Sequence, residues 1–179
     1  MAQIELLEER VVLVDDSGLA IGTAPKATVH DADTLLHLAF SCYVFNSLGE
    51  VLVSRRSLAK KTWPGVWTNS FCGHPLPGES IPDAIVRRAL FELGLELEDI
   101  RVTLPDFRYR AVDSSGIVEN EICPVYLATT AAEPLPNSDE VAEFAWADPA
   151  TLRRSVLDHP WAFSPWLGLQ IKELTDFDA

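Results

Sequence analysis

Short apolar runs separated by polar turns make up much of the first half of the chain. Residues 11–14 are apolar and predict a short strand, and residues 15–18 have the composition of a turn. Residues 35–45 form a longer apolar and aromatic run, which predicts a buried strand. After a turn at 46–49, residues 50–54 are expected to return as the second arm of a hairpin.

One stretch combines helical periodicity with signals for both of its ends. Ser80 is a typical N-cap residue, and Gly94 is a typical stop. Apolar residues recur between them at helical spacing, at Ile81, Ala84, Ile85 and Ala89. The sequence therefore predicts a helix over residues 80–93. Arg88 and Glu92 are four residues apart and share one face of that helix.

The second half of the chain again favours strands. Residues 101–112 alternate between polar and apolar side chains, with Tyr109 on the apolar face. Residues 117–128 predict a largely buried strand that carries Glu119 and Glu121 on one face. Such a pair more often faces solvent, but burying it without a cation would be costly. Further predicted elements are a strand at 143–147, a helix at 149–157 and a closing helix from 160 to about 174.

Composition indicates the class of protein. A chain of 179 residues, 47% hydrophobic and 23% charged, is expected to form a single domain over residues 1–179. Strands interleaved with a few helices predict an α/β sandwich around a mixed sheet. The acidic first ten residues do not resemble a signal peptide, and no apolar run reaches the length of a membrane span, so a cytoplasmic location is expected. Three cysteines without a CxxC pair favour reduced thiols.

The charge distribution narrows the choice of partners. A net charge of −13 argues against a nucleic acid or an anionic membrane as partner. Cations nevertheless gather locally within seven positions, at Arg55, Arg56, Lys60 and Lys61. This run alone would equally suit a solvated loop. Its place just before the loop at 63–74 favours a site for a small anionic substrate.

The loop at 63–74 carries the most unusual chemistry of the chain. Cys72 and His74 bring a thiol and an imidazole that can bind metal within a few ångströms of each other. A lone buried histidine such as His37 is usually a hydrogen-bonded core residue. The presence of His30 and His74 as well favours a role for all three as metal ligands.

The residues that follow resemble a Nudix box, a loop-helix-loop in which glutamates hold a divalent metal ion on a diphosphate. The resemblance rests on the spacing of Gly73, Glu79, Arg87, Glu92, Gly94 and Leu95. Two positions where a hydrolytic box has glutamates hold Arg88 and Phe91 instead. We therefore expect a diphosphate and metal site without the machinery that activates water.

Longer motifs narrow the resemblance to one family. They lie at residues 30–40, 63–69, 72–75, 107–110, 118–123 and 161–166. Together they resemble the type 1 isopentenyl-diphosphate delta-isomerases, over nearly the whole chain. The resemblance implies a Nudix-type α/β/α sandwich and the interconversion of isopentenyl and dimethylallyl diphosphate in isoprenoid biosynthesis. It also implies a small diphosphate as the substrate and a monomer or weak homodimer.

The resemblance implies two metal sites. Its pentadentate site, for Mn²⁺, Mg²⁺ or Zn²⁺, corresponds to His30, His37, His74, Glu119 and Glu121. Mixed imidazole and carboxylate ligands fit an octahedral ion better than a tetrahedral structural zinc. A second ion, Mg²⁺, would be held by Glu92 together with the substrate diphosphate.

The resemblance also implies the residues that bind and convert the substrate. The diphosphate-binding cations correspond to Lys26, Arg56, Lys60 and Arg88. The catalytic residues correspond to Cys72, Glu121, Tyr109 and Trp166.

Protonating an alkene gives a tertiary carbocation, so an acid and a base must flank the substrate and water must be excluded. An indole face such as that of Trp166 attracts the cation by about 2 kcal/mol when desolvated.

Two other functions compete with isomerisation. A Nudix pyrophosphohydrolase is the nearer alternative, and Arg88, Phe91 and Cys72 argue against it. A metal-binding module without catalytic activity would leave Cys72 and the basic cluster without a role.

Overall fold

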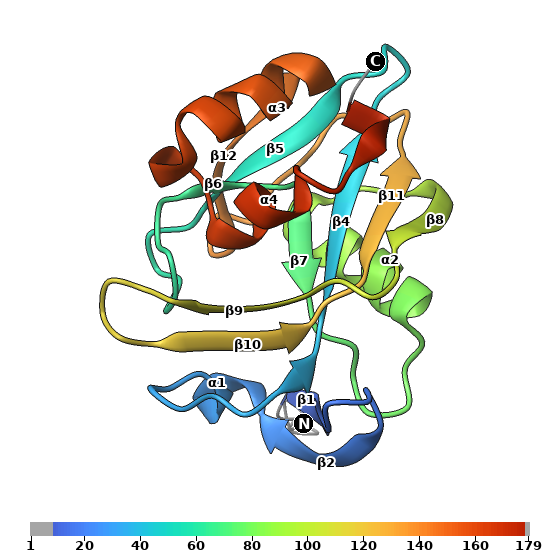
Figure 1. The fold of residues 1–179 in the computed structure, drawn as a ribbon. Helices are drawn as coiled ribbons and strands as arrows, with labels where there is room; N and C mark the ends of the chain where they lie inside the picture. The colour runs from blue at the N-terminus through green and yellow to red at the C-terminus, as the bar shows by residue number, and fades with distance from the viewer. Residues whose placement is uncertain (1–8, 178–179) are drawn as a thin grey trace, which may run out of the picture.

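The computed structural model describes residues 9–177, which form two β-sheets with helices packed around them (Figure 1). The first sheet contains, in spatial order, β2 (Ala20–Pro25), β1 (Arg10–Val14), β3 (His37–Leu38), β10 (Val118–Ile122) and β9 (Arg108–Val112). The second contains β12 (Val141–Ala147), β5 (Val51–Arg56), β4 (Phe40–Phe45), β11 (Val125–Thr129) and β8 (Glu98–Leu104). Two short strands extend it, β6 (Trp67–Thr68) on β5 and β7 (Phe71–Gly73) on β4. Each sheet has one parallel pair, β3 with β10 and β4 with β11, so the predicted mixed α/β architecture is confirmed with two sheets in place of one.

Three segments of the chain pass from one sheet to the other. β3 leads through Ala39 into β4, β8 leads to β9, and β10 leads to β11. The prediction of one continuous strand for each of the segments 35–45, 101–112 and 117–128 was therefore wrong. Prolines occupy two of the breaks, at residues 105 and 124, where a missing N–H prevents the ladder from continuing.

The remaining strand predictions are confirmed, although the hairpin pairs over a shorter stretch than expected. β1 and β12 confirm the predicted strands at 11–14 and 143–147. β4 and β5 form the predicted hairpin, but they pair only beside the turn, at Phe45 and Val51. β2 and the short helix α1 (Lys26–Val29) were not predicted, because β2 is exposed and has no apolar alternation.

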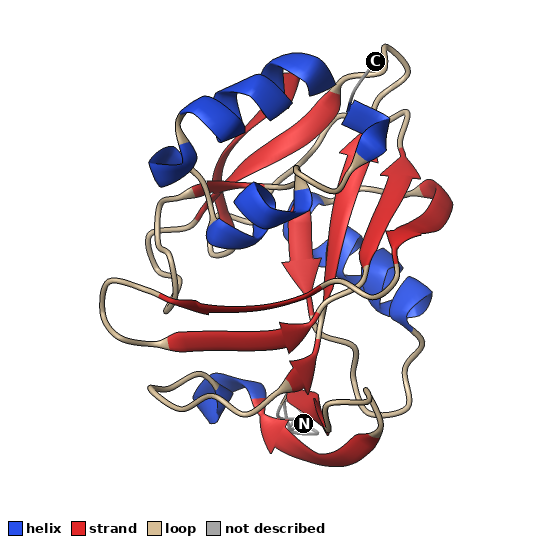
Figure 2. Cartoon of the chain, viewed as in Figure 1, coloured by secondary structure: helices blue, strands red, loops and turns tan. Residues whose placement is uncertain are grey.

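Helices cover both faces of the second sheet (Figure 2). α2 (Ile81–Leu93) confirms the predicted helix: the Ser80 side chain caps its start, and Gly94 ends it in a left-handed conformation with φ 63°. Its apolar residues pack with Cys42, Val44 and Leu52 on one face. The alternate residues of the same strands face α3 (Pro149–Asp158) and the C-terminal helices. None of the described helices is long and apolar enough to cross a membrane.

The predicted closing helix is broken. The segment contains a 3₁₀ turn η1 (Pro160–Ala162), a short helix α4 (Pro165–Gln170) and a second 3₁₀ turn η2 (Thr175–Phe177). Phe163 is extended, and the Ser164 side chain caps a new start for α4. This restart places Trp166 in the first turn of α4, fully buried against the core.

Candidate active site

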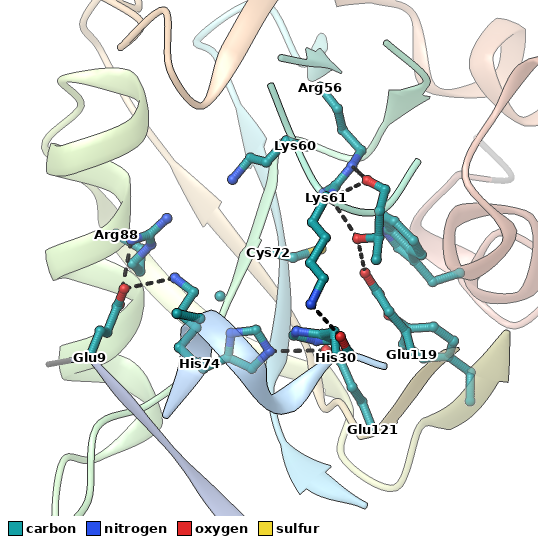
Figure 3. Close-up of a pocket in the computed structure, with 16 residues that line it drawn as sticks. Glu9, His30, Arg56, Lys60, Lys61, Cys72, His74, Arg88, Glu119 and Glu121 are labelled. Carbon is teal, nitrogen blue, oxygen red and sulfur yellow. Dashed lines mark hydrogen bonds and ion pairs between the residues drawn. The ribbon is translucent and has the colours of Figure 1, made fainter. Parts of the chain in front are cut away.

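A pocket of about 370 Å³ is lined by residues of both sheets and of α2 (Figure 3). The sequence-predicted residues that line it are Lys26, His30, Arg56, Lys60, Cys72, His74, Arg88, Tyr109, Glu119, Glu121 and Trp166. His37 and Glu92 lie just behind the wall, where each contacts a lining residue. The fold therefore gathers residues that are distant in sequence into one cavity.

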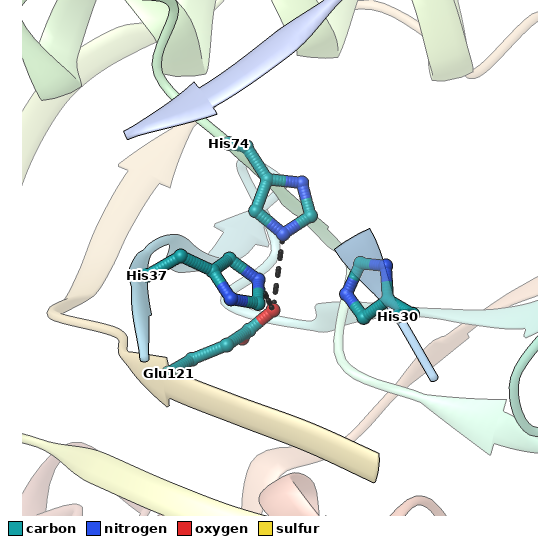
Figure 4. Close-up of side chains that lie close together, drawn as sticks. All are labelled: His30, His37, His74 and Glu121. Carbon is teal, nitrogen blue, oxygen red and sulfur yellow. Dashed lines mark hydrogen bonds and ion pairs between the residues drawn. The ribbon is translucent and has the colours of Figure 1, made fainter. Parts of the chain in front are cut away.

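Four of the predicted metal ligands converge at one end of this pocket (Figure 4). His30 follows α1, His37 lies in β3, His74 follows β7, and Glu121 lies in β10. One ligand atom from each lies within 4.8 Å of the others, so small movements of the side chains would bring all four to the distance of about 2.0–2.2 Å at which imidazole and carboxylate ligands bind zinc. Glu121 Oε1 lies 3.0 Å from His74 Nε2 and 3.4 Å from His37 Nε2.

Unpaired nitrogens support a metal at this position. Among the described residues, His30 Nε2, His37 Nε2 and His74 Nδ1 are buried without a hydrogen-bond partner. Burial lowers the pKa of His30 to about 3 and that of His74 to about 4, so both imidazoles are neutral at pH 7. Burial also acts to lower the pKa of His37, but the Glu121 carboxylate reverses this and raises it. Neutral imidazoles beside a carboxylate fit a divalent cation.

Glu119 has different partners from Glu121. Its carboxylate accepts hydrogen bonds from Tyr109 Oη at 2.5 Å and from Thr62 Oγ1 at 2.6 Å. Burial and the nearby charge of Glu121 raise the pKa of Glu119. Burial likewise opposes ionisation of Glu121, but its two histidines lower its pKa well below the usual value. The pKa values of these two carboxylates, on the same strand, are therefore shifted in opposite directions.

The Cys72 thiol lies in the same cavity on β7. Its Sγ is 3.3 Å from Ser41 Oγ and 3.2 Å from Asn69 Oδ1. Burial raises the pKa of Cys72 to about 12, so the group is a thiol at neutral pH. Trp166 forms the adjoining wall, with its ring centroid 5.8 Å from that of Tyr109 and 5.5 Å from that of Trp63.

Carboxylates accompany the predicted diphosphate-binding cations. Arg88 donates to Glu92 Oε1 through Nε at 2.8 Å and Nη2 at 2.6 Å, and both side chains are buried. Glu140 pairs with Lys60 and lies 3.4 Å from Arg88 Nη2. A bound diphosphate would therefore meet cations that are already held in place.

The basic run of the sequence is divided between two environments. Arg56 faces the pocket, with its guanidinium 5.3 Å from the Trp166 ring centroid, whereas Arg55 pairs with Glu143 on the far side. Lys26 reaches the pocket from α1, where it pairs with Glu9 at 2.9 Å. Figure 3 shows Arg56, Lys60, Lys61 and Arg88 around one cavity.

Sequence reasoning missed several polar residues around the site. They are Ser41, Thr62, Asn69, Glu140 and Gln170. Asn69 had a usable signal, since it lies three residues before Cys72 in the same loop. Ser41 and Thr62 each stand beside the end of a motif, whereas Glu140 and Gln170 lie outside the motifs, and only the fold brings these two close.

Comparisons with known proteins match most of the chain. The NUDIX domain pattern matches residues 35–167. The chain is 62% identical to an "Isopentenyl-diphosphate Delta-isomerase" of Agromyces mediolanus, over 93% of this chain and 81% of the relative. It is 61% identical to the Paenarthrobacter aurescens protein of the same name, over 96% and 93%.

Solved structures support the fold alone, because their sequences are distant. The DR0079 protein of Deinococcus radiodurans superposes with a TM-score of 0.71 at 20% identity, covering 92% of this chain and 98% of that one. A MutT protein from Methanosarcina mazei superposes with a TM-score of 0.59 at 19% identity, covering 80% and 93%.

Proposed function

The chain belongs to the Nudix family and, within it, to the isopentenyl-diphosphate Delta-isomerases, and from this membership we propose how its pocket works. The enzyme interconverts isopentenyl and dimethylallyl diphosphate by moving a carbon–carbon double bond. One proton is added to an alkene carbon, and another is removed from the carbon next to the resulting cation. The observation that carries this role is a half-buried thiol, Cys72, in one cavity with the carboxylate of Glu121.

The cation group binds the diphosphate end of the substrate. Lys26, Arg56, Lys60 and Arg88 line the cavity and supply charge-assisted hydrogen bonds to phosphate oxygens. Glu92, on the same face of α2 as Arg88, would hold Mg²⁺ on the diphosphate. These contacts fix the substrate so that its hydrocarbon end lies toward Cys72 and Trp166.

The histidine cluster would hold a second divalent ion, with His30, His37, His74 and Glu121 as ligands and Glu119, which lies outside this cluster, as the fifth. When bound, this ion would draw negative charge from the carboxylate of Glu121. The carboxylate of Glu121 exchanges a proton with the substrate. Tyr109 donates to Glu119 and keeps that carboxylate oriented.

Cys72 and Glu121 act as the two proton-transfer groups. A thiol can deliver a proton, and a carboxylate can accept one, from different sides of the bound hydrocarbon. Trp166 presents a ring to the carbocation, and its burial helps to exclude water, which would capture the cation as an alcohol.

Hydrolysis is not favoured. Arg88 and Phe91 occupy two positions where the Nudix box of a hydrolase has glutamates, and the Arg88 guanidinium lies 5.0 Å from the Phe91 ring centroid. Without those carboxylates the box lacks the groups that activate water.

A single incubation separates the alternatives. We expect isopentenyl diphosphate to be converted to dimethylallyl diphosphate without release of phosphate, as followed by phosphorus and proton NMR. Phosphate release would indicate a hydrolase, and an unchanged substrate would indicate a metal-binding module. The identities of the two ions, a monomer or weak homodimer, and a cytoplasmic location stay predictions.

A further inference from the structure

Asn69, between β6 and β7, has a fixed amide orientation. The side chain is fully buried, and its Nδ2 donates to the backbone carbonyls of Cys42 at 3.1 Å and Phe71 at 2.8 Å. A carbonyl oxygen can only accept a hydrogen bond, so the amide nitrogen must face these two groups. The Oδ1 atom therefore points in the opposite direction, toward the cavity wall.

That oxygen accepts hydrogen bonds from two proposed catalytic residues at once. Trp166 Nε1, which can only donate, lies 3.0 Å from Asn69 Oδ1, and Cys72 Sγ lies 3.2 Å from it. Thr68 Oγ1 donates to the same atom at 2.9 Å. Because an amide oxygen carries no proton, Cys72 must be the donor in its own contact. One atom thus aligns the thiol with the indole.

A second buried group holds the thiol from its other side. Ser41 Oγ lies 3.3 Å from Cys72 Sγ and accepts a hydrogen bond from Gln170 Nε2 at 2.8 Å. Tyr43 Oη in turn donates to Gln170 Oε1 at 2.7 Å. Ser41, Tyr43 and Gln170 are all fully buried, so no solvent reaches this series of hydrogen bonds.

We propose that Asn69 is a positioning residue for the isomerisation, holding the Cys72 thiol and the Trp166 ring in a fixed relation to each other beside the reacting carbons. The inference rests on the proposed function and adds a residue to it. Asn69 does not line the cavity, so it acts through its two partners. Misplacing a reacting group by about 1 Å can cost about 10²-fold in rate.

The test compares Asn69→Ala with a matched control, Ser70→Ala. Ser70 is also fully buried, and its hydroxyl accepts from Val44 N at 2.8 Å and donates to Leu52 O at 2.7 Å, away from Cys72. Both variants lose a buried hydrogen-bonding group, so both should be less stable than the parent. Only Asn69→Ala loses the oxygen shared by the thiol and the indole.

The metal-loaded variants are assayed with isopentenyl diphosphate. We expect Asn69→Ala to lower kcat by about tenfold to a hundredfold and to leave KM within about threefold, since the diphosphate contacts are untouched. Ser70→Ala should keep kcat within about threefold. In proton NMR the Trp166 indole N–H resonance, identified by its loss in Trp166→Phe, should shift in Asn69→Ala and stay in place in Ser70→Ala.

Several outcomes would overturn the inference. These are an Asn69→Ala kcat within about threefold of the parent, an equal loss in Ser70→Ala, or an unmoved Trp166 resonance. If Asn69→Ala does not fold, the isosteric Asn69→Asp takes its place, and it too should lower kcat because it lacks the donors that fix the orientation. A parent protein that does not isomerise the substrate would refute the proposed function itself, whereas an active parent with unaffected Asn69 variants refutes only this inference.

Discussion

Gly73 shows how closely single residues are fitted around this site. It stands between Cys72 and His74, and a Cβ added to it would lie 2.8 Å from Phe40 Cζ and 2.9 Å from Arg88 Cγ. The Phe40 ring is fully buried and cannot move aside cheaply. The absence of a side chain lets α2 approach β7 closely enough for Arg88 to reach the cavity.

We therefore expect Gly73→Ala to lower the free energy of unfolding by about 1–3 kcal/mol, the usual cost of overpacking a core. It should also raise KM, because displacing the Arg88 stem moves a diphosphate ligand. Gly168 in α4 is the control, since its Cβ would meet nothing within 4 Å. Gly168→Ala should leave KM unchanged and should not lower the free energy of unfolding. Denaturant unfolding and steady-state kinetics test the pair, and a neutral Gly73→Ala would contradict the packing argument.

A second residue-scale prediction separates the two proton-transfer groups. Cys72→Ala leaves the four clustered ligands in place, so the variant should fold, bind metal and bind substrate. Its isomerase rate should fall by more than the ~10²- to 10⁴-fold typical of one general acid or base. Glu121→Gln should also inactivate the enzyme, but with reduced metal content. Elemental analysis alongside the rates tells the two apart, and a Cys72→Ala rate within about tenfold of the parent would leave the thiol without a catalytic role.

At the scale of elements, α2 carries two adjacent arginines with different functions. Arg88 faces the cavity, whereas Arg87 ties the helix to the loop before it. Arg87 donates to both oxygens of Glu79 at 2.7 Å and to the backbone carbonyl of His74 at 3.1 Å. The Nudix box thus keeps its fold-forming ion pair although it has lost glutamates of the hydrolytic type.

This ion pair predicts an acid-dependent loss of stability. The hydrogen bonds from Arg87 hold the pKa of Glu79 below its ordinary value. A lowered folded-state pKa gives stability that is complete above the unfolded pKa of about 4.3 and is lost as the pH falls through the folded value. Unfolding measured from pH 6 to 3 should therefore show a shallower decline for Glu79→Gln than for the parent. Arg87→Gln should flatten the curve similarly, and parallel curves would rule the pair out as a contributor.

Elements with a strong local signal were predictable from the sequence, and those set by tertiary contacts were not. The α2 helix has its cap, its periodicity and its glycine stop within 15 residues, so its bounds were correct almost to the residue. The three segments that change sheets look like single strands, because apolar residues continue on both sides of each bend. The cavity residues were predictable where a motif holds them, as with Cys72. Ser41 and Gln170 lie far apart in ordinary strand and helix sequence, and only packing makes them neighbours of the thiol.

At the scale of the whole molecule, the metal ligands join segments that are distant in the sequence. His30, His37, His74 and Glu121 come from four separate elements. A bound ion would therefore cross-link the first sheet to the loop ahead of α2. Ligands that bind only the folded state stabilise it in proportion to the logarithm of their concentration.

We expect chelation to abolish turnover and to lower the Tm, and a divalent ion restored at about a hundred times its Kd to return about 2.7 kcal/mol of stability. His37→Gln should abolish this response. His159→Gln is the control, since this histidine is exposed and stacks on Trp161 away from the cluster. Calorimetry and rate assays with Mn²⁺, Mg²⁺ and Zn²⁺ make the comparison. Full activity of thoroughly metal-free protein would contradict the assignment.

The passage of three segments between the two sheets has a consequence for how the chain folds. Both parallel pairs, β3 with β10 and β4 with β11, join strands from opposite halves of the sequence. Such pairings close long loops before any contact stabilises them, which slows folding. The cavity cannot assemble in a nascent chain until β10 and β11 have emerged from the ribosome. On refolding, isomerase activity should therefore return only with the slowest phase of global folding. An amino-terminal fragment that ends before β10 should have no activity.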